Sequence, residues 1–305
     1  MNTIGFPRLG LGPFELAPTA FTLGPLSVQW YGIIIVCGMV LACLYAFWRM
    51  KSVPLVTDDM LDIAIVCIPL GIVGARLYYV LTSLKDFPTF WDVFKIWEGG
   101  LAIYGGIIGG FLGVFLVCRH KKKNLLAVLD CIAPGVMIGQ LVGRWGNFVN
   151  AEAYGVIGPY DFLGHTFDAT SFAEHNPFIM TINNMYVHPT FLYESVWNLV
   201  GFLLINAFWK HKKYNGQILL LYLTWYGLGR VWIEGLRTDS LYLFSTGIRV
   251  SQLVAALCVV IGGGALAFML IKRKPDPAQL YVNRKAESEA EAAQADEEAE
   301  KPENL

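Results

Sequence analysis

The chain has few charged residues and lacks the familiar hydrolytic motifs. Only 15% of its 305 residues are charged, whereas 55% are hydrophobic, and the mean hydropathy is +0.49. Soluble domains carry about a quarter charged residues, so this composition argues against an ordinary soluble fold and indicates an integral membrane protein. The sequence contains no HExxH zinc motif, no GxSxG nucleophile elbow and no Walker phosphate loop. Chemistry through a zinc-bound water or a serine acyl-enzyme is therefore unsupported.

The cysteines form no CxxC pair and show no metal-ligand spacing. Each falls in an apolar stretch, where a free cysteine behaves as a small hydrophobic residue. We therefore expect no disulfide framework, no metal site and no cofactor. The cysteines are Cys37, Cys43, Cys67, Cys118, Cys131 and Cys258.

Long hydrophobic runs dominate the rest of the chain. Their lengths approach the ~20 residues that a helix needs to cross a bilayer. We predict an all-α integral membrane protein with about seven transmembrane helices, built as one polytopic domain over residues 1–272. The runs cover about 28–48, 60–82, 100–118, 125–148, 190–209, 217–236 and 249–271.

Two polar segments lie outside these runs. Residues 151–189 contain no Lys or Arg and are too long for a simple turn, so we expect a small periplasmic subdomain between spans four and five. Residues 273–305 include the run ESEAEAAQADEEAE and predict a disordered, acidic cytoplasmic tail.

Basic residues concentrate in alternate loops of this topology. They follow the first, third, fifth and seventh runs, whereas the other loops carry few. By the positive-inside rule, the N-terminus is expected outside and the C-terminus in the cytoplasm. The residues on the basic side are Arg49, Lys51, Arg119, Lys121, Lys122, Lys123, Lys210, Lys212, Lys213, Lys272, Arg273 and Lys274.

Three arginines, Arg76, Arg144 and Arg230, fall inside predicted spans rather than in loops. The topology places all three at a similar depth, toward the periplasmic leaflet. Ionisable residues in a membrane are costly, so such residues indicate a functional site by default. Several guanidinium groups at the depth of lipid headgroups favour a phosphate, which arginine binds with two parallel hydrogen bonds.

The sixth run carries a polar face in the segment YGLGRVWIEGLR. Tyr226, Arg230, Glu234 and Arg237 are spaced by four, four and three residues, which places them on one side of a helix. A simpler interpretation is an Arg230–Glu234 ion pair that neutralises both charges in lipid. That interpretation leaves Arg237 and the other buried arginines unexplained.

The segment GRWGNFVNAEAYG, residues 143–155, is the densest polar cluster at a predicted membrane boundary. Arg144, Asn147 and Asn150 are spaced by three and drift slowly around a helix, so they face one cavity. Gly143 and Gly146 lack side chains, so a headgroup or a neighbouring helix can approach the backbone there. A polar contact between helices is the alternative to a binding site.

Several blocks of this sequence together resemble the prolipoprotein diacylglyceryl transferase family. Residues 143–155 resemble the family signature, and further blocks occur in family order. The resemblance covers roughly residues 20 to 272 and is loose through 156–187. The further blocks are WYG at 30–32, GARLYYV at 74–80, WEGGLAIYGGIIGG at 97–110, HPTFLYE at 188–194 and YGLGRVWIEGLR at 226–237.

The resemblance implies a membrane catalytic domain over residues 1–272 and an enzyme of the bacterial cytoplasmic (inner) membrane. Such an enzyme moves the diacylglyceryl group of phosphatidylglycerol to the lipobox cysteine thiol in a prolipoprotein signal peptide, forms a thioether and releases glycerol phosphate. Its expected partners are these two substrates and membrane lipid, with no nucleic acid and no cofactor.

The resemblance also implies roles for individual residues. Arg144 and Arg230 are expected to bind the phosphate and stabilise the leaving group, with secondary roles for Arg237 and Arg76. The remaining expected substrate-binding residues shape the headgroup site, hold Arg230 or line the pocket. They are Tyr31, Asn147, Asn150, Glu152, Gly155 and Glu234.

The base that removes the thiol proton stays open. Where many family members have His, this chain has Tyr104, and a phenol with a pKa near ~10 is a poor base at neutral pH. Three alternatives remain. Tyr104 could act as the base if a neighbouring arginine lowers its pKa, or His188 or Glu152 could take the proton. In the third alternative there is no dedicated base, and the arginines favour the thiolate. Tyr104 and His188 are the candidate proton carriers.

Two other functions remain as alternatives to the transferase. A non-catalytic transporter or binder of an anionic lipid headgroup would use the same arginines, but it would need polar groups along a path to the cytoplasm. A structural membrane scaffold would not explain costly arginines on three spans.

Overall fold

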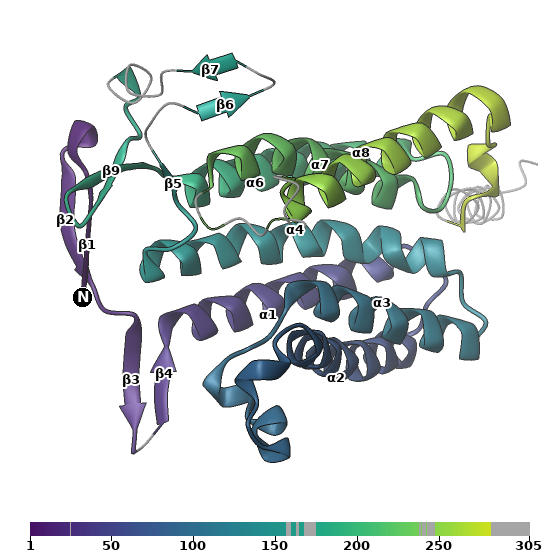
Figure 1. Cartoon of the computed structure of the whole chain (residues 1–305). Helices are drawn as coiled ribbons and strands as arrows, with labels where there is room; N and C mark the ends of the chain where they lie inside the picture. Colours follow the sequence, from purple (N-terminus) through teal and green to yellow (C-terminus); the bar gives the residue numbers. More distant parts are fainter. Residues whose placement is uncertain are drawn as a thin grey trace, which may run out of the picture. The chain divides into compact units, whose positions relative to one another are not determined.

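The computed structural model describes residues 1–24, 26–156, 160–162, 165–167, 175–237, 239, 242 and 248–281 (Figure 1). Its chain contacts divide it into two compact units. The first contains Met1–Ala46 and Ile132–Gln279, and the second contains Phe47–Cys131. The predicted acidic tail lies outside the described residues from position 282 onward.

Each predicted hydrophobic run is a long α-helix. Six of these helices are long and apolar enough to span a membrane, which confirms the prediction of an all-α multi-pass membrane protein. Helix α7 falls outside that group, and it carries Arg230 and Glu234, which lower its mean hydropathy. The count of seven spans therefore stays a prediction. The helices are α1 (Trp30–Met50), α2 (Thr57–Thr82), α3 (Ile103–His120), α4 (Leu125–Asn150), α6 (Thr190–Phe208), α7 (Gln217–Leu236) and α8 (Val250–Phe268).

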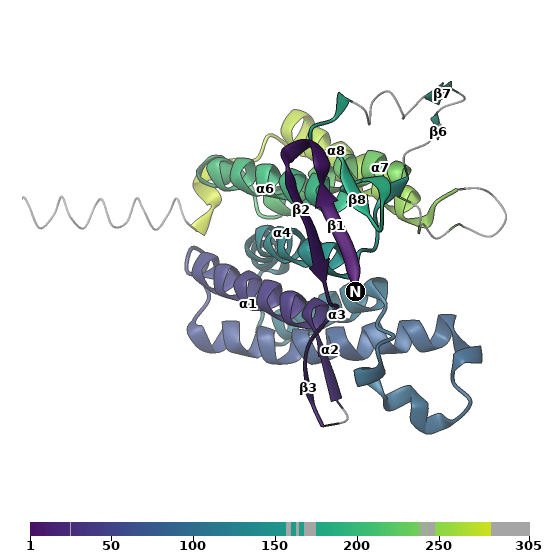
Figure 2. The ribbon, with the colours of Figure 1, turned by 90° about the vertical axis from the view of Figure 1, so that its left-hand side faces the viewer.

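The first unit also contains a five-stranded antiparallel sheet (Figures 1 and 2). Its order is β2-β1-β8-β9-β5, so the N-terminal strands pair with the segment between α4 and α6. Ile4 lies opposite Ile182 and Gly155 lies opposite His188. The strands are β1 (Asn2–Phe6), β2 (Leu11–Leu16), β5 (Gly155–Val156), β8 (Met180–Ile182) and β9 (Met185–His188).

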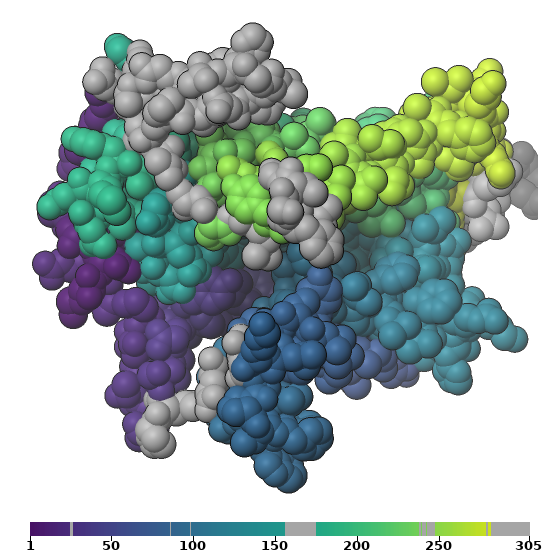
Figure 3. All heavy atoms as spheres, in the orientation of Figure 1, coloured from purple at the N-terminus to yellow at the C-terminus, as the bar shows by residue number. Residues whose placement is uncertain are grey.

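The sheet encloses a small apolar core of its own. Ile4, Met180, Ile182, Val187 and Phe191 are buried together. In Figure 3 the purple atoms of the N-terminal strands lie against the teal atoms of this region. Burial of this cluster fixes the direction in which the chain leaves β9 and enters α6, because Phe191 belongs to the first turn of that helix.

Four further strands form two hairpins outside this sheet. One hairpin precedes α1 and the other lies between β5 and β8. The hairpins are β3 (Thr19–Leu23) with β4 (Leu26–Gln29), and β6 (Tyr160–Phe162) with β7 (His165–Phe167).

The second unit is built on close packing of α2 against α3. A Cβ atom added at Gly105 would overlap the Gly74 carbonyl, and one added at Gly109 would overlap the Leu70 carbonyl. Small residues at this spacing let two helix backbones approach closely, which is the usual way that helices associate in lipid. Gly105 and Gly109 of the block at 97–110 thus have a packing function.

In the first unit, a reciprocal pair of tryptophans sets the register of α6 against α7. Trp197 Nε1 donates to the Trp225 carbonyl and Trp225 Nε1 donates to the Trp197 carbonyl, each at 2.9 Å. The two indoles stack with centroids 4.5 Å apart. Each ring occupies a space that a glycine leaves open, at Gly201 for Trp225 and at Gly229 for Trp197.

Gly229→Ala is expected to destabilise the protein by about 1–3 kcal/mol, because the new methyl group would overlap Trp197 Nε1 and force the indole out of its site. In an unobstructed helix the same change stabilises by about 1 kcal/mol. Gly264→Ala on α8 is the matched control, since a Cβ atom there meets nothing within 4 Å. The midpoint of thermal unfolding in detergent would be measured for both variants. Equal midpoints would contradict the inference that the Trp197–Trp225 pair sets the register of α6 against α7.

Candidate active site

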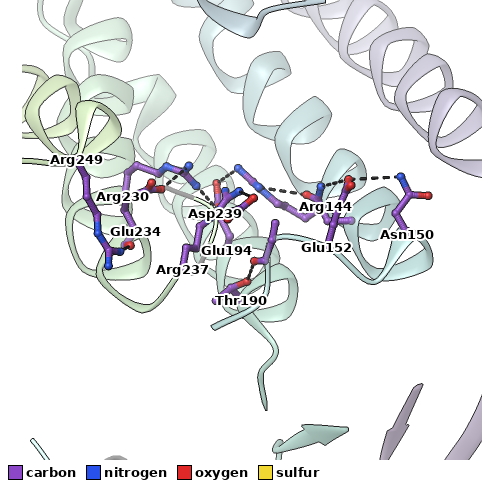
Figure 4. A network of polar contacts seen from close by, with 12 residues as sticks. Arg144, Asn150, Glu152, Thr190, Glu194, Arg230, Glu234, Arg237, Asp239 and Arg249 are labelled. Carbon is purple, nitrogen blue, oxygen red and sulfur yellow. Dashed lines mark hydrogen bonds and ion pairs between the residues drawn. The ribbon is translucent and has the colours of Figure 1, made fainter. Parts of the chain in front are cut away.

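Glu194, the fifth residue of α6, joins two arginines from two other helices (Figure 4). Its Oε1 accepts a hydrogen bond from Arg144 Nη2 at 2.6 Å, and its Oε2 accepts one from Arg230 Nη1 at 3.0 Å. Only 4% of Glu194 is exposed. A buried carboxylate that bridges two guanidinium groups compensates part of their charge and holds them at a fixed spacing.

Arg230 also makes the ion pair that its spacing to Glu234 predicts. Arg230 Nη2 lies 2.6 Å from Glu234 Oε2, one turn further along α7. Glu234 is buried, and its backbone carbonyl accepts a hydrogen bond from Arg249 Nη1. Arg230 therefore lies between two carboxylates, so the intrahelical pair is one part of a larger network.

The end of α4 holds the amides of the signature segment around Arg144. Arg144 Nη1 donates to Asn147 Oδ1 at 3.2 Å, and Asn147 Nδ2 donates to Glu152 Oε1 at 2.9 Å. Asn150 Nδ2 lies 3.5 Å from the same carboxylate oxygen. Ala151 has a positive φ of 52°, which turns the chain sharply after α4 and returns Glu152 toward its last turn.

Arg237 and Gly155 meet where the sheet reaches the end of α7. These two residues form an isolated antiparallel bridge, and Arg237 binds both carboxylate oxygens of Asp239 at 3.0 and 2.8 Å. A Cβ atom at Gly155 would lie 2.9 Å from the Leu236 carbonyl. Glycine is needed here because the backbone of α7 passes so close.

His188 is enclosed at the end of β9. It is 1% exposed, and its Nδ1 lies 3.4 Å from the hydroxyl of Tyr193. Burial lowers the pKa of the His188 imidazole below its ordinary value. At neutral pH the ring is therefore uncharged, which is the form that can accept a proton.

Tyr31, in the first turn of α1, packs on the signature segment. A Cβ atom at Gly146 would lie 2.7 Å from the Tyr31 ring, so the ring rests on the backbone of α4 at this glycine. Gly146 follows Arg144 by two residues and precedes Asn150 by one helical turn. About a third of Tyr31 (36%) remains exposed. Part of its side chain is therefore accessible beside the signature segment.

Two predicted site residues, Arg76 and Tyr104, belong to the second unit. The Arg76 guanidinium donates to backbone carbonyls of the segment that connects α2 to α3, and it lies over the Phe87 ring at 5.0 Å. These contacts give Arg76 a structural function, and its role in phosphate binding stays a prediction. The accepting carbonyls are those of Asp92, Val93, Lys95, Gly99 and Gly100.

Tyr104 lies in the first turn of α3 and is half-buried. Its ring centroid is 6.2 Å from that of Tyr78 on α2. The structure thus places Tyr104 in an aromatic contact of the second unit, and its role in proton transfer stays a prediction.

The sequence interpretation missed Glu194 and Asp239 as partners of the arginines. Glu194 lies in the block HPTFLYE, and the sequence could have indicated its role. Buried arginines on separate spans need a carboxylate to compensate them, and Glu194 is an acidic residue at the corresponding end of a neighbouring span. Asp239 follows Arg237 by two residues. This separation does not place two residues on one face of a helix, so the sequence did not indicate the pair.

This network of arginines and carboxylates on α4, α6 and α7 belongs to a multi-pass membrane protein, in which such charged residues are costly. The family model for prolipoprotein diacylglyceryl transferase matches residues 18–269. The chain belongs to this family, which confirms the resemblance found in the sequence and makes the protein a transferase.

Individual relatives agree with the family match. The chain is 42% identical over 268 residues to phosphatidylglycerol–prolipoprotein diacylglyceryl transferase 1 of Clostridium perfringens (strain 13 / Type A), covering 87% of this chain and 99% of the relative. It is 43% identical over 269 residues to the transferase of Streptococcus equi subsp. zooepidemicus (strain MGCS10565), covering 87% and 98%. The transferase of Staphylococcus aureus (strain Newman) is 43% identical over 261 residues, covering 85% and 91%.

Proposed function

We propose that this protein transfers the diacylglyceryl group of phosphatidylglycerol to the lipobox cysteine thiol of a prolipoprotein. The observation that carries the proposal is the pair of arginines bridged by Glu194. A phosphate ester becomes a more strongly charged leaving group as its bond breaks, and preorganised cations stabilise that charge. The names of the three relatives supply the lipid and the acceptor protein.

The reaction exchanges one bond for another at a glycerol carbon. The cysteine sulfur forms a C–S bond to the carbon that carries the phosphate ester, and the C–O bond to phosphate breaks. The bonding electron pair leaves with glycerol phosphate, and the thiol proton is lost as the sulfur attacks. Fixed arginines are suited to this step, because they need no reorganisation when the charge develops.

Arg144 and Arg230 keep donors available for the phosphate. A guanidinium has five N–H groups, and each of these arginines uses Nη1 and Nη2 in the network described. The remaining N–H groups can bind phosphate oxygens from two sides. Glu194 and Glu234 then act as positioning residues that hold the guanidinium planes.

The polar groups at the end of α4 suit the uncharged part of the headgroup. Asn147 and Asn150 both donate to Glu152, and the carboxylate can also accept hydrogen bonds from glycerol hydroxyls. Tyr31 and Gly155 shape the wall of this region, and Arg237 adds positive charge beside it.

Removal of the thiol proton has several candidate routes. A cysteine thiol has an unperturbed pKa near ~8.5 and reacts as the thiolate. The buried, neutral imidazole of His188 can accept a proton, as can the Glu152 carboxylate, and Tyr104 remains a further candidate. Positive charge from Arg144 and Arg230 would favour the thiolate without any base.

The same proposal includes a location and an orientation. The protein would lie in the bacterial cytoplasmic membrane with its N-terminus outside, because the basic residues cluster in alternate loops. Arg144, Arg230 and Glu194 would then lie toward the outer leaflet, where a secreted prolipoprotein can reach them.

A transfer assay tests the proposal. Purified protein in detergent would be mixed with labelled phosphatidylglycerol and a lipobox peptide, beside the same peptide with Cys replaced by Ser. We expect thioether-linked diacylglycerol on the Cys peptide alone. If neither peptide is modified where a relative of this family is active, the transferase proposal fails and a headgroup binder or transporter becomes the better explanation.

A further inference from the structure

Helices α4 and α6 each carry a neutral amide close to their ionic residue. On α4, Gln140 lies four residues before Arg144, and on α6, Asn198 lies four residues after Glu194. The two helices run antiparallel, since Ser195 contacts Leu141 whereas Gly201, further along α6, lies near Met137, earlier on α4. Both amides therefore lie on the same side of the ionic network, about 6 Å deeper along the helices at 1.5 Å per residue.

Helix α7 contributes Tyr222 at the depth of the Gln140 amide. Gln140 Nε2 donates to the Tyr222 hydroxyl at 3.0 Å, which joins α4 to α7. Asn198 lies on the buried face of α6 that also carries Glu194 and Gly201, the face that packs against both neighbours. We call Gln140, Asn198 and Tyr222 the neutral tier.

In the neutral tier Asn198 is buried, whereas Gln140 is half-buried with a buried amide oxygen. Asn198 is 1% exposed. Within the described part of the chain, neither amide atom of Asn198 has a hydrogen-bond partner, nor has Oε1 of Gln140. Of these three atoms, Asn198 Nδ2 is the donor, whereas the two amide oxygens are acceptors. A buried amide without a partner costs about 1–3 kcal/mol, and lipid supplies no water to offset that cost. A leucine at position 198 would avoid it, so stability alone does not account for the amide.

We propose that the neutral tier binds the ester carbonyls of the lipid's diacylglyceryl group. This inference rests on the proposed function. In a glycerophospholipid the ester groups follow the phosphate in the direction of the acyl chains, so a phosphate bound at Arg144 and Arg230 directs them toward the tier. An amide N–H is a suitable donor to a carbonyl, and a neutral donor avoids competing with the arginines for the phosphate.

The test compares ester-linked with ether-linked phosphatidylglycerol, which lacks the two carbonyls. For the unmodified protein, kcat/KM for transfer should be about 3- to 10-fold higher with the ester lipid, the range expected for one neutral hydrogen bond. In Asn198→Leu the ratio should fall to about 1, with transfer from the ether lipid retained. Asn198→Ala serves as a second variant should the leucine side chain impair folding.

Asn206→Leu is the matched control on the same helix. Its amide already donates to the Phe202 carbonyl and accepts from the Tyr45 hydroxyl, so the ester-to-ether ratio should stay that of the unmodified protein. An ester-to-ether ratio that is unchanged in both Asn198 variants overturns the inference while the transferase stands. Absence of transfer from either lipid in the unmodified protein removes the proposed function itself.

Discussion

Arg230→Lys is expected to lower kcat for diacylglyceryl transfer by about 100- to 1000-fold, the range for losing a preorganised donor to a developing anion. Lysine keeps the charge but loses the planar fork. Its single ammonium group cannot reach Glu194 and Glu234 from opposite sides and still present donors to a phosphate. Steady-state transfer to a lipobox peptide would measure the change.

Arg119→Lys is the control for Arg230→Lys. Arg119 is exposed at the last turn of α3, so the same exchange there should leave kcat within a factor of two or so, as is usual for surface substitutions. If both variants retain kcat to a similar degree, the bidentate geometry of Arg230 has no part in the reaction, and phosphate stabilisation must be sought elsewhere.

Glu194→Gln is expected to destabilise the protein by about 3 kcal/mol, the lower end of the range for breaking a buried pair, because it leaves two half-buried guanidinium groups without their shared buried carboxylate. Glutamine has nearly the same shape, so packing changes little. Transfer should fall together with stability, since the spacing between Arg144 and Arg230 is no longer held. Denaturant unfolding in detergent would give the free energy, and the transfer assay would give the activity.

A double variant separates charge compensation from general damage. Glu194→Gln combined with Arg144→Met should cost less than the sum of the two single changes, because the second change removes one of the uncompensated charges. Glu15→Gln, at an exposed position of β2, should have almost no effect. Strict additivity of the two single changes would show that the carboxylate does not compensate Arg144.

Local spacing predicted the parts of the site that lie on one helix. The separation of four residues between Arg230 and Glu234 places them on one face of α7, and the ion pair forms there. The spacing of Arg144 and Asn147 likewise produces a contact along α4. Interactions between residues three or four apart depend only on helical geometry, so a sequence can reveal them.

Contacts between distant segments were not predictable in this way. The pairing of β1 with β8 joins positions about 180 residues apart, and nothing in the N-terminal segment indicates a strand partner. The contacts of Arg76 were likewise not predictable from the sequence. Its position inside a span indicated a phosphate ligand, whereas the fold surrounds it with carbonyls of a single connecting segment.

Hydropathy, periodicity and a long polar signature are properties of short stretches of chain, so they could predict the membrane class of the protein, the long helices that the structure describes and the family. The pairing of Glu194 with Arg144 and Arg230, and the stacking of Trp197 on Trp225 between α6 and α7, became evident from the fold alone. A carboxylate can compensate any cation within reach. Which cations come within reach depends on how helices pack, and packing is a property of the whole fold.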